Sequence, residues 1–375
     1  MKKKNHKTAV EVQNLAARRE TRKRESRESF SQVTSSLAKE IDTNKEEPVS
    51  TDETEILERF AESSMEDSQT MDVGLLTIKS FNQVLFDAAK KKEPTKLYDE
   101  FWYEGETCCL FADSNVGKSI LAVQIARNIA TSQKVLYFDF ELSEYHFLRR
   151  YTDDETNQPY KFPKNLYRVC LNYMMGAYTV EELPDKIMSN IEKSVRETSA
   201  SVIIIDNLTW IAYNSKSPKM AGELMKRLST MKVQYNLSML ILAHTPKRNM
   251  SKPITQNDLG GSKMIMNFLD SAFAIGFSSK DPNIRYIKQI KVRYAEMKYG
   301  EDNVWLCEMR KVRSFLMLFR LGFGMESDHL KKRKDGDKEA LITKIKVMKA
   351  NGMSIREIAA ELGMSPATVD RYSKK

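Results

Sequence analysis

The chain has 375 residues, of which 41% are hydrophobic, and a formal net charge of +9. It is long enough to bury one substantial core with accessory segments, and its charge favours a polyanionic partner, either nucleic acid or an anionic surface. It holds no apolar run of about 18 residues and no N-terminal signal pattern, so neither membrane insertion nor secretion is indicated and a cytoplasmic protein is expected.

Composition divides the chain into four segments. Residues 1–70 are rich in Lys, Arg, Glu, Ser and Thr, which predicts a disordered charged arm that either contacts phosphates or is simply solvated. In residues 71–328 apolar blocks of strand and helix type alternate, which predicts an α/β domain with a mainly parallel sheet. Residues 329–338 are expected to be a linker, and residues 339–375 show the pattern of a small all-α domain.

Within the α/β segment, the stretch LFADSNVGKSILAVQIA joins an apolar strand to a helical pattern. Strand, loop and helix in this order suit a phosphate-binding loop, which needs converging backbone N–H groups, a lysine for the β- and γ-phosphates, and a hydroxyl for Mg²⁺. Ala112 stands where such a loop usually begins with glycine, and alanine is the least bulky replacement if φ is negative there. The predicted nucleotide-binding residues in this loop are Ala112, Asp113, Ser114, Asn115, Val116, Gly117, Lys118 and Ser119.

Two further carboxylates follow apolar strands. The run SVIIID ends at Asp206, where a P-loop fold places the carboxylate that holds the Mg²⁺ shell, together with Ser119. Asn207 comes next, so the carboxylate that activates water must lie elsewhere. Glu141 follows the strand KVLYFDF, on the rim where α/β sheets place ligands, although it could instead cap the following helix. The sequence therefore predicts ATP and Mg²⁺ as ligands, with Glu141 as the base.

A Glu at this place resembles the RecA-like ATPases, and the downstream motifs are similar to those of hexameric helicases of the RepA and DnaB types. MLILAHTPKR ends a strand at His244, like the family motif that senses the γ-phosphate, although a lone His at a strand end can be structural. DLGGSKMIMNFLDSAFAI looks like the loop and strand that line the channel for single-stranded DNA in that family. The resemblance implies a DNA-binding role for Gly260, Gly261, Ser262 and Lys263.

The segment YIKQIKVRYAEMKYG contains Lys291 and Arg293, similar to the basic finger pair of the same family. The resemblance implies that both reach the ATP of a neighbouring subunit in a homo-hexamer, and a strand here would project them from one face. The alternative is a solvated edge strand. The resemblance covers about residues 100 to 320. It departs from DnaB in showing no helical collar ahead of the core, so the chain looks closer to the RepA-type ATPases of plasmids and other mobile elements.

The C-terminal segment combines an amphipathic stretch with two short helical patterns. Gly363 allows a turn into SPATVDRYSKK, and Ser365 and Pro366 fit an N-cap and a first helical position. Together these patterns resemble a resolvase-like helix-turn-helix, which implies contacts to duplex DNA from Ser365, Thr368 and Arg371. Small helical triplets also serve as protein-docking modules.

These patterns lead to one leading hypothesis and two alternatives. The leading hypothesis is an ATP-hydrolysing, RecA-like DNA motor or loader, with a helicase in the replication or mobilisation of a plasmid or transposon as its main form. In it, Lys118 holds phosphates, Glu141 polarises water, and, by resemblance only, His244 reports loss of the γ-phosphate. The alternatives are a recombination or repair ATPase that does not unwind DNA, and a DNA-binding regulator switched by nucleotide.

Overall fold

The computed structural model of the chain describes residues 70–172, 182–208, 218–246, 248–260, 263–331 and 335–374. The predicted arm, residues 1–70, lies outside the described residues except for its last position. The chain divides into two compact units, one ending at Glu93 and the other beginning at Pro94. No helix in the described part of the chain is long and apolar enough to span a membrane.

The described part of the first unit is a hairpin followed by a helix. Strands β1 (Met71–Val73) and β2 (Leu76–Ile78) pair antiparallel, and helix α3 (Phe81–Ala89) follows. Ser80 caps this helix by accepting a hydrogen bond from the backbone N–H of Gln83. These elements precede the division at Pro94, although the sequence predicted that the α/β domain begins at residue 71.

A nine-stranded sheet forms the centre of the second unit, in the order β13-β12-β11-β10-β5-β9-β8-β6-β7. Its strands from β10 to β7 run parallel, whereas β11, β12 and β13 extend the sheet antiparallel, so the predicted mainly parallel sheet is confirmed. The strands are β5 (Thr107–Ala112), β6 (Val135–Asp139), β7 (Leu166–Val169), β8 (Val202–Asp206), β9 (Ser238–His244), β10 (Ser271–Phe277), β11 (Ile284–Lys291), β12 (Val304–Val312) and β13 (Phe315–Gly324). A separate ribbon pairs β3 (Lys96–Tyr98) with β4 (Trp102–Tyr103).

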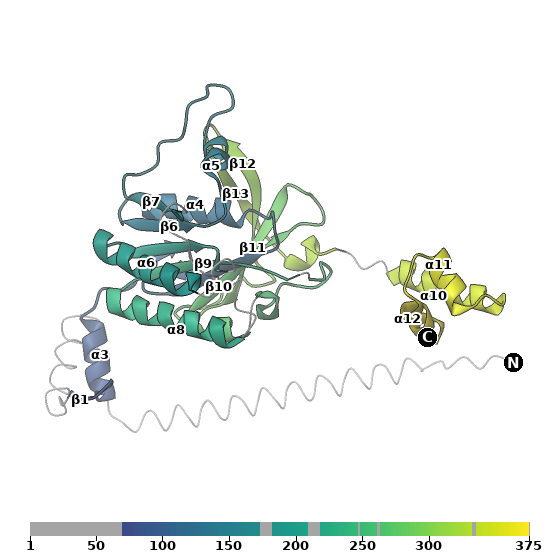
Figure 1. Cartoon of the computed structure of the whole chain (residues 1–375), viewed down its shortest axis with the longest axis horizontal. Helices are drawn as coiled ribbons and strands as arrows, with labels where there is room; N and C mark the ends of the chain where they lie inside the picture. The colour runs from purple at the N-terminus through teal and green to yellow at the C-terminus, as the bar shows by residue number, and fades with distance from the viewer. Residues whose placement is uncertain are drawn as a thin grey trace, which may run out of the picture. The chain divides into compact units, whose positions relative to one another are not determined.

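Helices cover both faces of this sheet (Figure 1). Consecutive strand residues alternate between two hydrophobic clusters: Phe111 and Ile205 pack in the cluster that includes helices α6 and α8, and Leu110 and Ile204 in the cluster that includes α4. Because both faces are covered, these strands are continuous apolar runs. Among the described residues of this unit ahead of residue 270, the α-helices are α4 (Lys118–Ile129), α5 (Glu144–Arg150), α6 (Leu183–Thr198), α8 (Pro218–Tyr235) and α9 (Lys263–Phe268).

The hairpin of β12 and β13 packs against helix α4. The side chain of Gln124 forms two hydrogen bonds with the backbone of Leu318 in β13. Its Nε2 donates to the Leu318 carbonyl at 3.2 Å, and its Oε1 accepts from the Leu318 N–H at 3.0 Å. Met309 of β12 approaches Gly117, where an added Cβ would lie 3.0 Å from the methionine Cε. The antiparallel extension of the sheet therefore shapes one wall beside the phosphate loop.

A buried ion pair holds the segment that follows β9. Lys288 Nζ and the Glu326 carboxylate form a close pair, and the Glu326 side chain is fully buried. The two groups also bind both backbone polar groups of one residue: Glu326 accepts from the N–H of Ile254 at 2.7 Å, and Lys288 donates to the carbonyl of Ile254 at 3.0 Å. This clamp fixes the chain between the end of β9 and the start of α9.

The C-terminal helices form a small three-helix unit with its own core. Helix α10 (Asp335–Ala350) begins inside the stretch expected to be a linker, and α11 (Ile355–Glu361) and α12 (Pro366–Ser373) follow. Gly363 adopts a left-handed φ of +61°, and Ser365 caps α12 with proline in its first turn, as predicted. The core residues are Ile345, Met348, Ile358, Ala359 and Val369.

The clamp at Ile254 predicts a specific loss of stability. Glu326→Ala leaves the Lys288 ammonium buried beside only the more distant Glu301, 3.8 Å away, so the free energy of unfolding should fall by about 3–5 kcal/mol. Urea denaturation followed by circular dichroism measures this change. Asp328→Ala is the matched control. Asp328 lies two positions after Glu326 and forms an exposed ion pair with Lys280, so its removal should lower the free energy of unfolding by less than about 1 kcal/mol. Equal losses in the two variants would contradict the clamp.

Candidate nucleotide site

The phosphate loop connects the buried end of β5 to the first turn of α4. Ala112 is the last residue of the strand, in extended backbone, so the condition under which alanine can replace glycine is met. Gly117 caps α4 with a left-handed φ of +111°, and its missing Cβ leaves room for Met309. Asn115 is also left-handed, with φ of +62°. The loop thus turns tightly where the sequence predicted it.

Lys118 lies folded across this loop. Its Nζ donates to the carbonyls of Ala112 and Asp113, at 2.9 and 3.1 Å. Burial lowers the pKa of Lys118, against the attraction of Asp206 and other nearby carboxylates. The first N–H groups of α4 have no partners within the helix, so this end of the helix suits an anion. A buried ammonium beside unpaired N–H groups fits the phosphates of a nucleotide.

Asp206 and Ser119 provide oxygen ligands suited to Mg²⁺. Asp206 ends β8 and is almost fully buried, and burial raises the pKa of its carboxyl group to about 6. Hydrogen bonds from Ser119 and Tyr137 oppose this rise, the phenol donating at 2.7 Å. A carboxylate next to a hydroxyl is the donor set that Mg²⁺ shares with nucleotide phosphates. The residues present therefore fit the predicted ATP and Mg²⁺.

Glu141, Asn207 and His244 meet on the other side of Lys118. The Asn207 amide donates to Glu141 Oε1 in a very short contact, and its Nδ2 lies 3.0 Å from His244 Nε2. His244 Nδ1 lies 3.1 Å from Lys118 Nζ. An ammonium can only donate, so Nδ1 is the acceptor in that contact, and Nε2 lies between the Asn207 amide and Glu141 Oε1, the latter at 3.5 Å. The contact with His244 is the main cause that lowers the pKa of Glu141, which keeps its carboxylate ionised.

The structure excludes one of the two interpretations of Glu141, that of a helix cap. Helix α5 is capped by Ser143, which accepts from the N–H of His146, so Glu141 is not the N-cap. Asp139 instead orients the turn, because its Oδ1 accepts from the N–H groups of Glu141 and Leu142 at 3.1 and 2.9 Å. The Glu141 side chain is left to line the pocket beside the phosphate loop.

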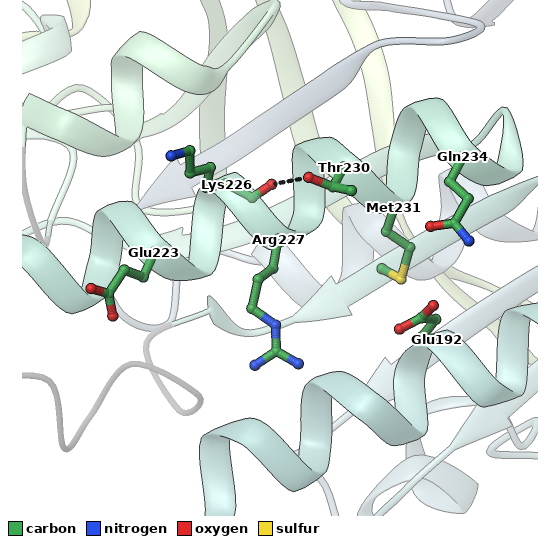
Figure 2. A pocket seen from close by; sticks show the side chains of 7 residues that line it. All are labelled: Glu192, Glu223, Lys226, Arg227, Thr230, Met231 and Gln234. Atoms are coloured by element: carbon green, nitrogen blue, oxygen red, sulfur yellow. Dashed lines mark hydrogen bonds between the residues drawn. The ribbon is translucent and has the colours of Figure 1, made fainter. Parts of the chain in front are cut away.

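These groups surround a cavity of about 400 Å³. It is lined by Ser114, Asn115, Gly117, Lys118, Ser119, Ile120, Glu141, Leu142, Arg150, His244 and Met309. A larger hollow of about 520 Å³ lies between α6 and α8, with Met231 and Thr230 on its wall (Figure 2). Two of its charged groups already have protein partners, since Arg227 pairs with Asp185 and Glu192 accepts from Tyr235. The smaller cavity, which holds the phosphate loop, is the candidate functional site.

The side chain of Asp113 has partners outside the phosphate loop. Its carboxylate accepts from Thr245 Oγ1 at 2.8 Å and pairs with Arg248 Nε at 3.3 Å, so its side chain ties the phosphate loop to the segment after β9. Sequence reasoning missed Arg248, Asn207 and Tyr137. Asn207 could have been found, because it directly follows a predicted metal carboxylate. Arg248 lies 135 positions from its partner, and no local pattern connects them.

The predicted DNA loop begins at a close backbone contact with the site. The N–H of Gly260 donates to the carbonyl of His244 at 2.9 Å, and a Cβ on Gly260 would lie 2.2 Å from that oxygen. Gly260 is therefore required by packing, whatever else it contacts. Gly261 and Ser262 lie outside the described residues, as does the side chain of Lys263. The backbone of His244 therefore contacts the start of this loop directly.

The predicted finger pair does not share a strand. Strand β11 ends at Lys291, and Arg293 lies in the bend that follows, so the expected projection from one strand face is wrong. The strand lies between β10 and β12, but its ladder with β12 covers only Ile284 to Ile287, so at Lys291 the ladder partner is β10. Lys291 donates to the carbonyl of Met266 at 2.7 Å, and Arg293 pairs with Asp270 at 3.2 Å.

The register also shows where this pair lies in the sheet. Lys291 pairs with Ala272, near the amino end of β10, whereas Ile275 of the same strand pairs with Ala112 at the phosphate loop. The finger pair is therefore at the edge of the sheet opposite its own nucleotide site. A role toward this chain's own nucleotide does not fit that position.

The three predicted DNA contacts in α12 differ in their surroundings. Ser365 Oγ accepts from the N–H of Thr368 at 3.3 Å and lies 2.8 Å from the Thr368 hydroxyl, so both hydroxyls already take part in the cap. Arg371 is exposed on the helix. Of the three, Arg371 has the exposed charged side chain, with its guanidinium 5.2 Å from the Tyr372 ring centroid, and it suits contact with a phosphate or a base edge.

Two segments of the chain match known families. Residues 76–250 match the AAA domain family, and residues 340–372 match a helix-turn-helix domain family. Among solved structures, the chain is similar to a KaiC-like protein from the hyperthermophilic archaeon Pyrococcus horikoshii, at 14% identity and a TM-score of 0.43, over 58% of this chain and 91% of that chain. Comparison with curated proteins finds no match. With the phosphate loop and strand order, the family matches support a RecA-like P-loop ATPase domain and a C-terminal helix-turn-helix.

The raised pKa of Asp206 predicts how metal-dependent activity changes with pH. The carboxylate binds Mg²⁺ and the protonated acid does not, so ATP hydrolysis at limiting Mg²⁺ should fall as the pH drops through about 6. Tyr137→Phe removes a hydrogen bond that lowers this pKa, so the fall should begin about one pH unit higher. Hydrolysis rates measured from pH 5 to 8 test this shift.

The matched control makes the same chemical change away from the site. Tyr235→Phe removes a phenol that binds Glu192, beside the hollow between α6 and α8, and should leave the pH profile unchanged. Identical profiles for the Tyr137 variant and the wild type would show that this phenol does not tune Asp206.

Proposed function

We propose that this protein is an ATP-hydrolysing DNA motor or loader, with a helicase in plasmid or transposon replication or mobilisation as the leading form. The observation that carries the proposal is the meeting of Lys118, Glu141 and His244 with Asp206 at one edge of the sheet. Such a set suits phosphoryl transfer to water, in which catalysis is mainly positioning and electrostatic stabilisation.

Each residue has a separate task in the proposed reaction. Lys118 binds the β- and γ-phosphates, and Ser119 and Asp206 hold the metal. Bound Mg²⁺ would supply charge neutralisation at the phosphate oxygens. Glu141, ionised and held by Asn207, orients the attacking water and accepts its proton. His244 contacts both Lys118 and the Glu141 cluster, so its surroundings change when phosphate charge arrives or leaves.

The link from His244 to Gly260 supports a motor over a simple hydrolase. The His244 carbonyl and the Gly260 N–H are hydrogen-bonded, and the space between them admits no side chain. Gly260 opens the segment that resembles the DNA loop of hexameric helicases. Events at the γ-phosphate thus reach the proposed DNA-binding loop through one backbone contact. The net charge of +9 and the helix-turn-helix match also favour a nucleic-acid partner.

An assay of ATP hydrolysis with and without single-stranded DNA tests the function. The wild type should hydrolyse ATP faster with the strand present, and Lys118→Ala should show no detectable turnover. Glu141→Gln should bind ATP normally but hydrolyse it roughly 10²- to 10⁴-fold more slowly, because an amide cannot accept the proton of water.

The alternatives give different outcomes in the same assay. Stimulation without directional strand displacement would favour the recombination or repair ATPase. Absence of stimulation, together with binding to a specific duplex, would favour the nucleotide-switched regulator. Unchanged hydrolysis by Lys118→Ala would contradict the nucleotide site itself.

The proposed assembly is a ring, in which Arg293 reaches the nucleotide of a neighbouring subunit. Its position at the far edge of the sheet from its own site agrees with action across an interface. To act there it must exchange Asp270 for a phosphate oxygen. A guanidinium supplied in this way contributes about 10³- to 10⁵-fold in rate in other phosphoryl-transfer enzymes.

Mixing two inactive variants tests this assembly. Arg293→Ala retains Glu141, and Glu141→Gln retains Arg293, so co-assembled rings contain some interfaces with both groups intact. ATPase activity should partly recover on mixing and should depend on the ratio of the two proteins. Normal activity of Arg293→Ala alone, or no recovery after co-assembly is verified by size-exclusion chromatography, would refute the finger.

A further inference from the structure

The wall of the nucleotide cavity includes a second positively charged side chain, which has no task in the proposed reaction. Arg150, the last residue of α5, lines the same cavity as Lys118, Ser119 and Glu141. It is contributed by the same polypeptide, about one helix length after Glu141, and so reaches this site without a neighbouring subunit. The inference below rests on the proposed ATPase function and concerns how the nucleotide is held.

Arg150 lacks the partners that other arginines near this domain's polar clusters have. Arg168 pairs with Asp139, Arg248 with Asp113, and Arg293 with Asp270. Arg150 as a residue is half-buried, and its guanidinium forms no hydrogen bond or ion pair with any residue that the structure describes. Withdrawing a charge from water without pairing it is costly, so an arginine in this state is suited to an anionic ligand.

The adjoining cavity strengthens the positive charge at this place. Arg150 and Leu142 also line a hollow of about 420 Å³ whose wall includes His146, Arg149 and Lys311. Lys311 is already engaged, since it pairs with Asp154 at 2.6 Å. Among the residues that line these two cavities, Glu141 has the only carboxylate, and it is held by His244 and Asn207. Arg150 therefore has room for an anionic partner that arrives with the ligand.

We propose that Arg150 is a phosphate-binding residue that acts in cis, donating to oxygens of the triphosphate whose other side is held by Lys118. Guanidinium is planar and presents several donors in a fixed geometry, so it can bind two phosphate oxygens at once, whereas the Lys118 ammonium acts as a point charge. The two cations would enclose the phosphates from the helix α5 side and the loop side of one cavity. Affinity for nucleotide in a single chain then depends on Arg150, independently of ring assembly.

The experiment compares Arg150→Gln with Arg149→Gln. The two substitutions are chemically identical and adjacent, but Arg149 is exposed and lines only the second hollow. Binding is measured by displacement of a fluorescent ATP analogue, with Mg²⁺ present, by ATP and by inorganic tripolyphosphate. Arg150→Gln should weaken both competitors by roughly 10- to 100-fold, and Arg149→Gln should change neither by more than about twofold.

Arg150→Lys provides a second variant, because it keeps the charge and the apolar stem and loses only the bidentate geometry. It should lose part of the affinity, and thermal unfolding without nucleotide verifies that every variant is folded. Unchanged affinity in Arg150→Gln, or weakened ATP with unchanged tripolyphosphate, would overturn the assignment, the latter because the contact is then to base or ribose. A wild type that binds no ATP would instead overturn the proposed function, and this inference with it.

Discussion

One buried ammonium group connects the parts of the nucleotide site. Lys118 Nζ bonds to carbonyls at the end of β5 and to His244 at the end of β9, and it is attracted by Asp206 at the end of β8 and by Glu141 after β6. These four strands are neighbours in the order β5-β9-β8-β6 and run parallel, so their carboxyl ends lie together. The site therefore depends on strand order as much as on the phosphate loop. Burial makes the ammonium costly, and the surrounding carbonyls and carboxylates offset that cost.

The sequence predicted those features whose causes are local. Apolar runs followed by polar residues identified the strand ends at Asp206 and His244, and the glycine before Lys118 identified the start of the helix. The core strands are buried on both faces, so their composition alone distinguished them from surface strands. The helix caps at Ser365 and the turn at Gly363 likewise follow from residues within a few positions of each other.

Contacts between distant residues could not be predicted in this way. Nothing near Asp113 shows that its carboxylate pairs with Arg248, and nothing near Lys288 shows that Glu326 holds it in the core. The end of β11 could not be predicted either. The pattern of alternating residues continues to Arg293, whereas the hydrogen-bonded ladder stops at Lys291. In each case tertiary pairing decides the outcome, and one sequence carries no signal of it.

The two edges of the sheet separate two kinds of positive charge. At the carboxyl edge, Lys118 and the unpaired Arg150 face one cavity within a single chain. At the amino edge, Arg293 is held by Asp270, which also accepts from the N–H of Thr107 at the start of β5. An arginine that already has a carboxylate must exchange it to bind phosphate, whereas one without a partner can bind directly. The free arginine therefore suits nucleotide capture by one chain, and the paired one suits a contact made only when a neighbour offers a stronger anion.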